Sequence, residues 1–529
     1  MTVSLAASHA GPTGVAAAMV ALGLLVAVSV ADRPWYGRGG SRRKAAMHRG
    51  ARWGRPRDLA SLLARKPEPG RLVLGLIGGR GTLGRRTVAA EPAQSLAVVG
   101  TTQSGKTTAL AVPAILRWSG PVLAASVKTD LLADTIGWRR GRGTVWCFDP
   151  VGVTGVPSAR WSPLASSRSW AGARRAAADL TEVAQGPETT ADGEFWYATA
   201  AKLLAPLLFA AAVDGRSMRD VVRWVDTQEV GEVAGILGYA GVPEALHAAC
   251  ATFGRDDRQR SSVYTTVETI LEPFAEPDVP GAPNAPHDVE DDIDVERLLT
   301  GDNSLYLCAP AHDQRRLRAV FTGLVKEVFD AAYTRAARSG APLDPPLLVV
   351  LDEAANIAVP RELDGLAATA AGHGVQLVTV WQDLAQVGAR FGPRAATVVN
   401  NHRAKLFLSG TSDPGTLDQA SHLVGDEEVL VPSITSTRDG SSTTASPLRR
   451  PLLPPDALRR LAPGTGVLLY GSLPPLRLTL RPWWEDRELA RRAGGHTPKP
   501  GRRVGRRPLR RRVIHGWRRS IRQPSPSGR

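Results

Sequence analysis

The chain has 529 residues, 43% of them hydrophobic, which is enough for two or more domains with a sizeable core. The net charge is +16 and the pI is near 10.4, and much of this charge lies from Lys499 onward, where no acidic residue occurs. This asymmetry indicates an appended basic tail that meets nucleic acid or anionic lipid. The three cysteines (Cys147, Cys250 and Cys308) are far apart, which excludes a disulfide or zinc framework and favours buried thiols in a reducing compartment.

The first candidate element is the apolar, uncharged run at residues 15–31, VAAAMVALGLLVAVSVA, which is just long enough to cross a bilayer. A basic cluster follows it directly, made of Arg33, Arg38, Arg42, Arg43 and Lys44. A cleaved signal peptide and a buried alanine-rich helix are the alternatives. Because positive flanks stay inside, we favour residues 1–44 as a membrane anchor with one transmembrane helix and its N-terminus outside.

A phosphate-binding loop is predicted after the apolar run at residues 96–99. Residues 100–107, GTTQSGKT, satisfy the pattern GxxxxGK[ST], and helix-forming residues follow. Glycines let the backbone wrap round a phosphate, the lysine reaches the β/γ-phosphates of ATP, and the threonine hydroxyl ligates Mg²⁺. The alternative is a glycine turn that carries a lysine by chance, but lysine is scarce in this arginine-rich chain. The predicted nucleotide-binding residues are Gly100, Thr101, Thr102, Gln103, Ser104, Gly105, Lys106, Thr107 and Thr108.

The pattern of residues 45–165 predicts the first part of an α/β ATPase domain. A glycine-rich strand pair near Leu72–Arg85 precedes the loop, and strands at Val122–Ser126 and Thr144–Phe148 follow it. Strands that alternate with helical segments are typical of a parallel, doubly wound sheet. Residues 166–290 have helical spacing instead, and indicate an all-α insertion that closes with an exposed loop at Pro277–Asp292. Its expected helices are Ala171–Ala184, Phe195–Val213, Met218–Val225, Val230–Leu237 and Ser261–Phe274.

Residues 291–486 predict the second part of the ATPase domain, and they carry the acidic half of the site. The apolar strand at residues 347–351 ends in Asp352 and Glu353, placed to hold Mg²⁺ and to activate the attacking water respectively. An acidic helix start after a strand is the alternative. Gln382 follows a strand at Val375–Val380 and is a candidate sensor of the γ-phosphate, although such a residue is often a helix cap or a surface amide. The other expected elements are a strand at Ser304–Cys308, a helix at Leu317–Ala337, strands at Ala404–Ser409 and Gly466–Tyr470, a mobile loop at Ser433–Ser446, and a basic disordered tail at residues 487–529.

Taken together, these motifs resemble the coupling proteins of type IV secretion, the TraG/TraD-like ATPases of conjugation, in particular their actinobacterial members. The resemblance covers residues 48–484. It rests on the order of ARW at residue 51, GTTQSGKT, SVKTDLLADT at 126, FDP at 148, WSPL at 161, LDEAANI at 351, WQDLAQV at 381, NNHRAKLFLSG at 400 and DPGT at 413.

The resemblance implies a RecA-like hexameric ATPase in the cytoplasmic membrane, with its ATPase domain in the cytoplasm. Such a protein hands a relaxase-bound single DNA strand to the components of a type IV secretion channel. In this family a helical domain inserted between the nucleotide motifs recognises the protein substrate, which maps onto residues 166–290. A nucleotide-binding adaptor that passes protein substrates without pumping DNA is the alternative.

Three departures from the family pattern stand out. Many relatives have two membrane helices, whereas this chain shows one such run. The acid usual after the second strand is Ser126 here. An arginine that many relatives offer across the subunit interface is absent from residues 371–374, which read AGHG. Arg390, Arg394 and Arg403 are candidate substitutes for that cation.

The tail from Lys499 to Arg529 generates the first testable prediction. Arginines neutralise phosphates and Trp517 offers a stacking platform, so the tail should contact the backbone of single-stranded DNA. Each neutralised phosphate then contributes about −0.7 to the slope of log affinity against log salt. Deleting residues 499–529 should make that slope flatter by several times about 0.7 and should weaken binding equally for all DNA sequences. Titration of labelled oligonucleotides at several salt concentrations measures both changes. Equal slopes for both proteins would assign the tail to lipid binding or solubility.

Overall fold

The structure is a computed structural model that describes residues 50–65, 68–78, 86–185, 191–275, 292–310, 313, 316–356, 359–437 and 440–494. The predicted transmembrane helix at 15–31, the tail from 499 and nearly all of the loop at 277–292 lie outside these residues. The chain divides into two compact units. The described part of the first unit is Gly50 and a hairpin within 427–449, while the second runs from Ala51 to Asp426 and resumes at Arg450.

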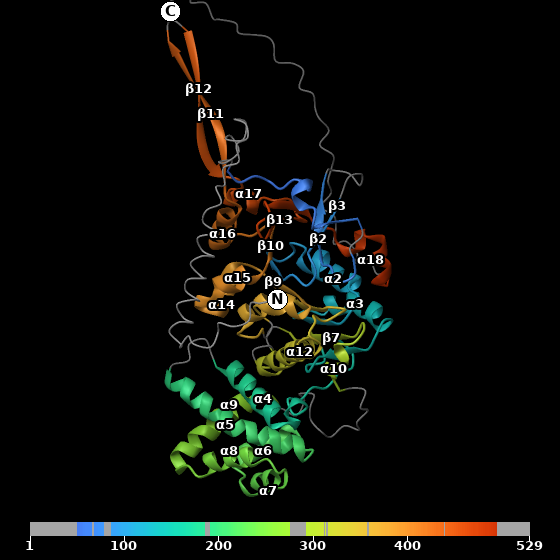
Figure 1. Cartoon of the computed structure of the whole chain (residues 1–529), viewed down its shortest axis with the longest axis vertical. Coiled ribbons are helices and arrows are strands. Elements are labelled where there is room, and N and C mark those ends of the chain that lie inside the picture. Colours follow the sequence, from blue (N-terminus) through green and yellow to red (C-terminus); the bar gives the residue numbers. More distant parts are fainter. Residues whose placement is uncertain are drawn as a thin grey trace, which may run out of the picture. The chain divides into compact units, whose positions relative to one another are not determined.

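A twelve-stranded sheet forms the centre of the second unit (Figure 1). Seven of its strands are parallel, as the alternation of strands and helices predicts. All their residues except Val145 and Lys405 are buried, because most of these residues are apolar and the strands are covered on both faces. In spatial order they are β10 (Ala404–Leu408), β4 (Leu96–Val99), β9 (Val375–Trp381), β8 (Leu347–Leu351), β5 (Val122–Ser126), β7 (Ser304–Cys308) and β6 (Val145–Phe148).

Five antiparallel strands extend the sheet beyond β10. In spatial order they are β13 (Thr465–Tyr470), β14 (Leu476–Thr479), β2 (Val73–Ile77), β3 (Arg86–Ala89) and β1 (Leu63–Ala64). The sequence predicted the pair near Leu72–Arg85 and β13, but neither β14 nor its pairing with β2. In this part of the sheet, a strand near the beginning of the described chain (β2) pairs with a strand near its end (β14).

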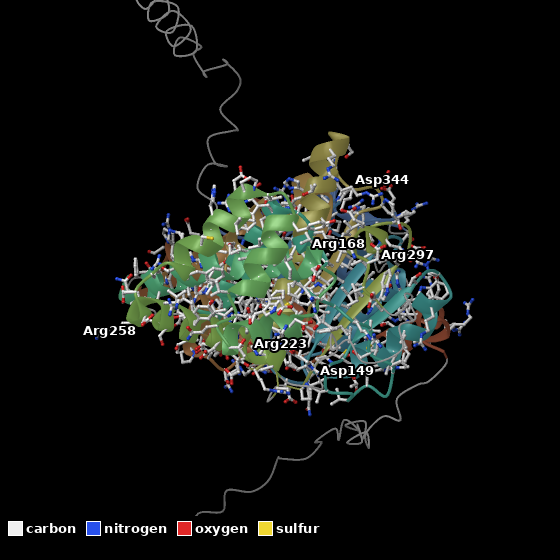
Figure 2. All side chains as sticks on the ribbon, turned by 90° about the horizontal axis from the view of Figure 1, so that it is seen from below. Asp149, Arg168, Arg223, Arg258, Arg297 and Asp344 are labelled. Atoms are coloured by element: carbon white, nitrogen blue, oxygen red, sulfur yellow. The ribbon has the colours of Figure 1, made fainter. Side chains whose placement is uncertain are left out.

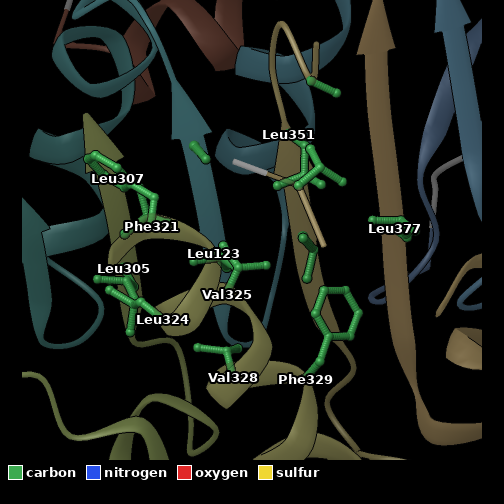
Figure 3. Packing of buried hydrophobic residues seen from close by; sticks show 14 of the residues in the cluster. Leu123, Leu305, Leu307, Phe321, Leu324, Val325, Val328, Phe329, Leu351 and Leu377 are labelled. Carbon is green, nitrogen blue, oxygen red and sulfur yellow. The ribbon is translucent and has the colours of Figure 1, made fainter. Parts of the chain in front are cut away.

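Helices cover both faces of the parallel strands, and side chains alternate between two cores. Leu123 and Leu305 point to the face covered by α12 (Arg318–Ser339), where Phe321 and Phe329 pack against them (Figure 3). The opposite face, with Tyr306, carries α2 (Val112–Arg117) and α3 (Asp130–Arg140). Each fully buried leucine or phenylalanine in these cores contributes about 1.5–3 kcal/mol. The other described helices of this unit outside the insertion are η2 (Pro56–Leu59), η3 (Thr107–Ala111), α10 (Val295–Leu298), α13 (Leu363–Thr369), η6 (Ala370–His373), α14 (Leu384–Phe391), η7 (Gly392–Arg394), α15 (Ala395–Asn401), α16 (Pro414–Val424), α17 (Pro455–Arg459), η8 (Trp483–Glu485) and α18 (Arg487–Arg492).

Between β6 and β7 the chain forms the expected helical insertion, which has a core of its own (green in Figure 1). Its described helices are η4 (Ser166–Arg168), α4 (Trp170–Ala184), α5 (Ala191–Val213), α6 (Met218–Asp226), α7 (Gly231–Tyr239), α8 (Pro243–Phe253) and α9 (Asp257–Ala275). The sequence reading missed α8. Charged side chains such as Arg223 and Arg258 lie on the outside of these helices (Figure 2). Among the described residues, Gly193–Val213 is long and apolar enough to span a membrane, but 61% of its most apolar window is buried within the structure.

Three expectations are wrong. Of residues 433–446, expected as a mobile loop, 433–437 and 440–446 belong to the strands of a long hairpin, β11 (Asp426–Thr437) and β12 (Gly440–Pro451), and β-branched threonine is a residue type that favours a paired strand. Cys250 is exposed, although Cys147 and Cys308 are buried as expected. The tail does not begin at residue 487, since Asp486 caps the ordered helix α18 and Leu489 is buried.

Helix α18 is attached to the far end of the helix that begins at the phosphate loop. Arg117 of α2 forms an ion pair of 2.9 Å with Asp486, and Arg492 donates to the carbonyl of Leu116 at 2.6 Å. Close by, the indole of Trp483 donates to Asp134 of α3 at 3.1 Å.

The amino ends of β5 and β7 are held together by a buried arginine, Arg139. Its guanidinium donates to the hydroxyl of Ser304 at 2.6 Å and to four backbone carbonyls, those of Trp118, Gly120, Asp302 and Asn303, at 2.8–3.1 Å. Burial lowers the pKa of this guanidinium.

Replacing Arg139 with methionine keeps an unbranched apolar stem but removes the guanidinium, and leaves these buried acceptors without their donor. We expect the free energy of unfolding to fall by about 3 kcal/mol, measured by thermal or urea unfolding. Arg140→Met on the exposed face of the same helix is the matched control and should change it by no more than about 0.5 kcal/mol. Equal stabilities of the two variants would show that the carbonyls find other donors.

Candidate nucleotide-binding site

Three neighbouring parallel strands bring the predicted motifs to one edge of the sheet. Strand β9 pairs with β4 on one side and with β8 on the other, so the phosphate loop, Gln382 and Asp352 all follow carboxyl ends at the same edge. Two backbone hydrogen bonds fix these ends, from Gly100 to the carbonyl of Trp381 (3.0 Å) and from Ala354 to that of Val380 (2.9 Å). The crevice beyond the carboxyl ends of parallel strands is where such sheets bind ligands.

The phosphate loop has the backbone that close wrapping requires. Gln103 and Gly105 have φ values of +64° and +95°, in the left-handed region. A Cβ on Gly100 would lie 2.8 Å from the Cβ of Leu408, so this position accepts only glycine. The hydroxyl oxygen of Ser104 is buried and has no hydrogen-bond partner among the described residues.

The helix that follows starts with a π-helical turn. The N–H of Val112 bonds to the carbonyl of Thr107, five residues back, and Pro113 has no N–H to continue an α-helical ladder. This helix runs through η3 and α2 to Arg117, with its positive end at the loop.

The side chain of Lys106 is folded onto its own loop. It is buried, and its ammonium group donates to the carbonyl oxygens of Gly100 and Thr101, the second at 2.8 Å. Burial lowers the pKa of this ammonium group, while the carboxylates of Asp352 and Glu353 act in the opposite direction. Phosphate oxygens could take the place of the two carbonyls.

A hydrogen bond joins the loop to the acidic motif. The hydroxyl of Thr107 donates to one carboxylate oxygen of Asp352 at 2.8 Å, while the other oxygen is buried without a partner among the described residues. Burial raises the pKa of Asp352 to about 6, and the threonine hydroxyl partly opposes this. A hydroxyl beside an unsatisfied buried carboxylate oxygen is a donor set that fits Mg²⁺.

The neighbouring Glu353 has a backbone in the left-handed region, and two side chains bind its carboxylate. Its φ is +59°, and its carboxylate forms an ion pair with Lys128 at 2.7 Å and accepts a long contact from the amide of Asn356 at 3.5 Å. The hydrogen bond to Glu353 raises the pKa of Lys128. Sequence reasoning did not predict this pair, although Lys128 and Glu353 each follow the end of one of two paired strands, β5 and β8.

Gln382 lies at the same edge and is connected to α14. Its backbone N–H donates to the side-chain oxygen of Gln386 at 3.1 Å. The edge therefore gathers every residue predicted for binding, metal coordination and catalysis, while their roles stay predictions.

The three candidate substitutes for the missing arginine lie in different places. Arg390 is half-buried and donates to the carbonyl of Val359 at 2.9 Å, and Arg394 is exposed and lies 3.5 Å from Asp364. Arg403 precedes β10, at the opposite edge of the sheet from the phosphate loop. Arg403 therefore cannot reach the loop of its own chain.

Comparisons with known proteins agree with this architecture. The sequence profile of the family described as "Type IV secretory system Conjugative DNA transfer" matches residues 75–504. The conjugal transfer protein TraG of Escherichia coli is 26% identical over 411 residues, which are 70% of this chain and 62% of TraG. Protein VirD4 of Agrobacterium fabrum is 25% identical over 422 residues, 74% of this chain and 59% of VirD4. The chain thus spans about three fifths of the length of these relatives.

Solved structures show the same fold. The plasmid coupling protein TrwB, in complex with the ATP analogue ADPNP, is 18% identical and superposes with a TM-score of 0.58 over 82% of this chain and 94% of that chain. TrwB in complex with ADP and Mg²⁺ gives a TM-score of 0.57 over the same shares. The expected RecA-like P-loop α/β fold is confirmed.

The raised pKa of Asp352 predicts a pH-dependent cost of folding. In the unfolded chain the pKa is about 3.9, so at pH 7.5 the buried charge destabilises the nucleotide-free protein by roughly 3 kcal/mol, and this cost disappears as the pH falls through 6 toward 4. Asp352→Asn should therefore be the more stable protein at pH 7.5 and equal to the parent near pH 4, measured by urea unfolding without Mg²⁺. The exposed Asp418→Asn is the control and should show no such trend. A stability gain that is the same at both pH values would contradict this explanation.

Proposed function

The chain belongs to the type IV secretory system conjugative DNA transfer family, and from this premise we propose that it is a membrane-anchored ATPase. It couples ATP hydrolysis to the transfer of relaxase-bound single-stranded DNA into a type IV secretion channel. The observation that carries the proposal is the hydrogen bond between Thr107 and Asp352, because it joins the phosphate loop to the acidic strand end in the arrangement that ATP hydrolysis needs. The ADPNP and ADP–Mg²⁺ complexes of TrwB support ATP and Mg²⁺ as ligands.

Binding is assigned to the loop and its lysine. The backbone of Gly100–Thr108 cradles the phosphates, and Lys106 exchanges the carbonyls of Gly100 and Thr101 for β/γ-phosphate oxygens. Thr107 and Asp352 hold Mg²⁺, which when bound neutralises charge on the phosphates.

Catalysis is assigned to Glu353 and Gln382. Glu353 orients the attacking water and accepts its proton, and Lys128 and Asn356 position the carboxylate for this task. Gln382 senses the γ-phosphate, and its contact with Gln386 transmits the presence of that phosphate to α14.

Membership of the family supports the remaining parts of the proposal. Residues 15–31 anchor the chain in the cytoplasmic membrane as a single span, with the ATPase domain in the cytoplasm. The helical insertion recognises the relaxase or another protein substrate, and six copies form a ring. The division into residues 1–44, 45–165, 166–290, 291–486 and 487–529 is retained as a proposal, with the start of the basic tail moved beyond Gly494.

An adaptor that binds nucleotide without pumping DNA is the second candidate, favoured by the sequence AGHG at residues 371–374, where relatives offer an arginine across the subunit interface. It predicts nucleotide binding without turnover, so hydrolysis separates the two functions.

Two substitutions should separate binding from turnover. Lys106→Ala removes the phosphate contact and should weaken ATP binding at least tenfold, whereas Glu353→Gln should keep the affinity and lower the hydrolysis rate by about 10²–10⁴. Nucleotide affinity and phosphate release, measured on the protein with and without single-stranded DNA, give both values.

Glu91→Gln is the matched control, because Glu91 is also ion-paired (with Arg403, at 3.2 Å) but lies at the opposite edge of the sheet. It should leave both quantities unchanged. Hydrolysis at the parental rate by Glu353→Gln would remove Glu353 from the role of base, and no hydrolysis by the parent would favour the adaptor.

A further inference from the structure

A cavity of about 320 Å³ lies next to the nucleotide site. Four segments form it: the end of α4, the start of α12, the residues after β8, and α14. Its lining includes three half-buried arginines, Arg318, Arg361 and Arg390, and none of the described residues that line it is acidic or aromatic. The composition is that of a site for an anion.

Two of these arginines donate hydrogen bonds to neutral groups. Arg361 donates to the carbonyl of Gln185, and Arg390 donates to that of Val359. Burial and the charges of Arg318 and Arg361 lower the pKa of Arg390 to about 10, so it stays charged at neutral pH. Arg361 and Arg390 are like charges close enough to repel each other, which a bound anion would relieve, and arginine's planar fork matches phosphate oxygens.

Two carboxylates that adjoin lining residues in the sequence are bound by a lysine. Glu182 precedes the lining residue Val183, and Glu362 follows Arg361, but both bind the ammonium group of Lys326, at 2.9 and 3.2 Å. Their charge is therefore countered by that lysine.

An independent observation also indicates a ligand. Thr322 lines the cavity, its side chain is buried to 99%, and its hydroxyl oxygen has no hydrogen-bond partner among the described residues. A buried hydroxyl without a hydrogen-bond partner is unfavourable, and a ligand oxygen in the cavity would provide that partner.

Two lining residues contact the nucleotide site directly. Asn356 lies 3.5 Å from the carboxylate of Glu353, and Gln386 accepts the N–H of Gln382 at 3.1 Å. An anion in the cavity is thus one side chain away from both residues assigned to catalysis.

We propose that this cavity binds a phosphodiester group of the transported single strand and reports its presence to Glu353 and Gln382. The proposal rests on the proposed function. The absence of an aromatic platform among the described lining residues favours a backbone phosphate over a base, and hence recognition without sequence preference. Free phosphate or a nucleotide phosphate shares this chemistry, and the experiment separates these sources.

The test compares the full chain with the double variant Arg318→Gln/Arg361→Gln. Binding of labelled oligothymidylate at several salt concentrations should show a slope that is flatter by about 1.4, two phosphates at about 0.7 each, and an affinity about tenfold lower. Stimulation of hydrolysis by this DNA should be lost, while ATP affinity should be unchanged. The control Arg335→Gln/Arg338→Gln removes two exposed charges from the same helix, α12, and should behave as the parent.

Each other outcome has a defined meaning. Unchanged slope and unchanged stimulation in the double variant would overturn the inference. Loss of inorganic phosphate or ATP binding with an unchanged DNA slope would assign the cavity to free phosphate or nucleotide instead. If the melting temperature of the double variant falls, Arg361→Gln alone provides the test, with half the change in slope. A parent chain that neither binds DNA nor hydrolyses ATP would instead refute the proposed function.

Discussion

The parallel pairing of β9 between β4 and β8 is the constraint on which the site depends. Each of these strands ends in a chemically active residue or loop, and only parallel neighbours in register place all three ends at one edge. The strands are short and buried on both faces, so a shift in register would transfer their apolar side chains between the two cores that α2 and α12 cover. The packing that stabilises the fold therefore also fixes the geometry of the site.

At that edge two cations and two anions balance one another. Lys106 and Lys128 face Asp352 and Glu353, but the pairing is uneven, since Lys128 binds Glu353 directly while Lys106 binds backbone carbonyls and Asp352 keeps one oxygen unsatisfied. The buried half of the site, Lys106 and Asp352, is thus arranged for groups from outside the chain, namely phosphate oxygens and a metal ion. The more accessible half, Lys128 and Glu353, is already paired within the chain.

The sequence predicted which residues meet at this edge, because motif spacing and the succession of strands along the chain are local properties. Strands β4, β5, β7 and β8 were predicted to the residue, since each is a continuous apolar run between polar ends. Contacts between distant segments were not predictable: the ion pair of Lys128 with Glu353 depends on β5 lying beside β8, and the three-arginine cavity depends on how α12 and α14 pack. The hairpin β11–β12 was missed because a serine- and threonine-rich segment has no apolar alternation to mark a strand.

The attachment of α18 to α2 has a mechanical consequence. The described chain ends at Gly494. Two residues earlier, Arg492 donates a hydrogen bond to the carbonyl of Leu116, and Asp486 forms an ion pair with Arg117. A tension applied to the segment beyond Gly494 therefore acts first on the carboxyl end of α2. From there a continuous helix of roughly 17 Å, at 1.5 Å per residue, leads back to the loop that holds the phosphates. Because the helix is stiff, a force on its carboxyl end is transmitted to the phosphate loop. Force on α18 and nucleotide binding at the loop are therefore mechanically coupled.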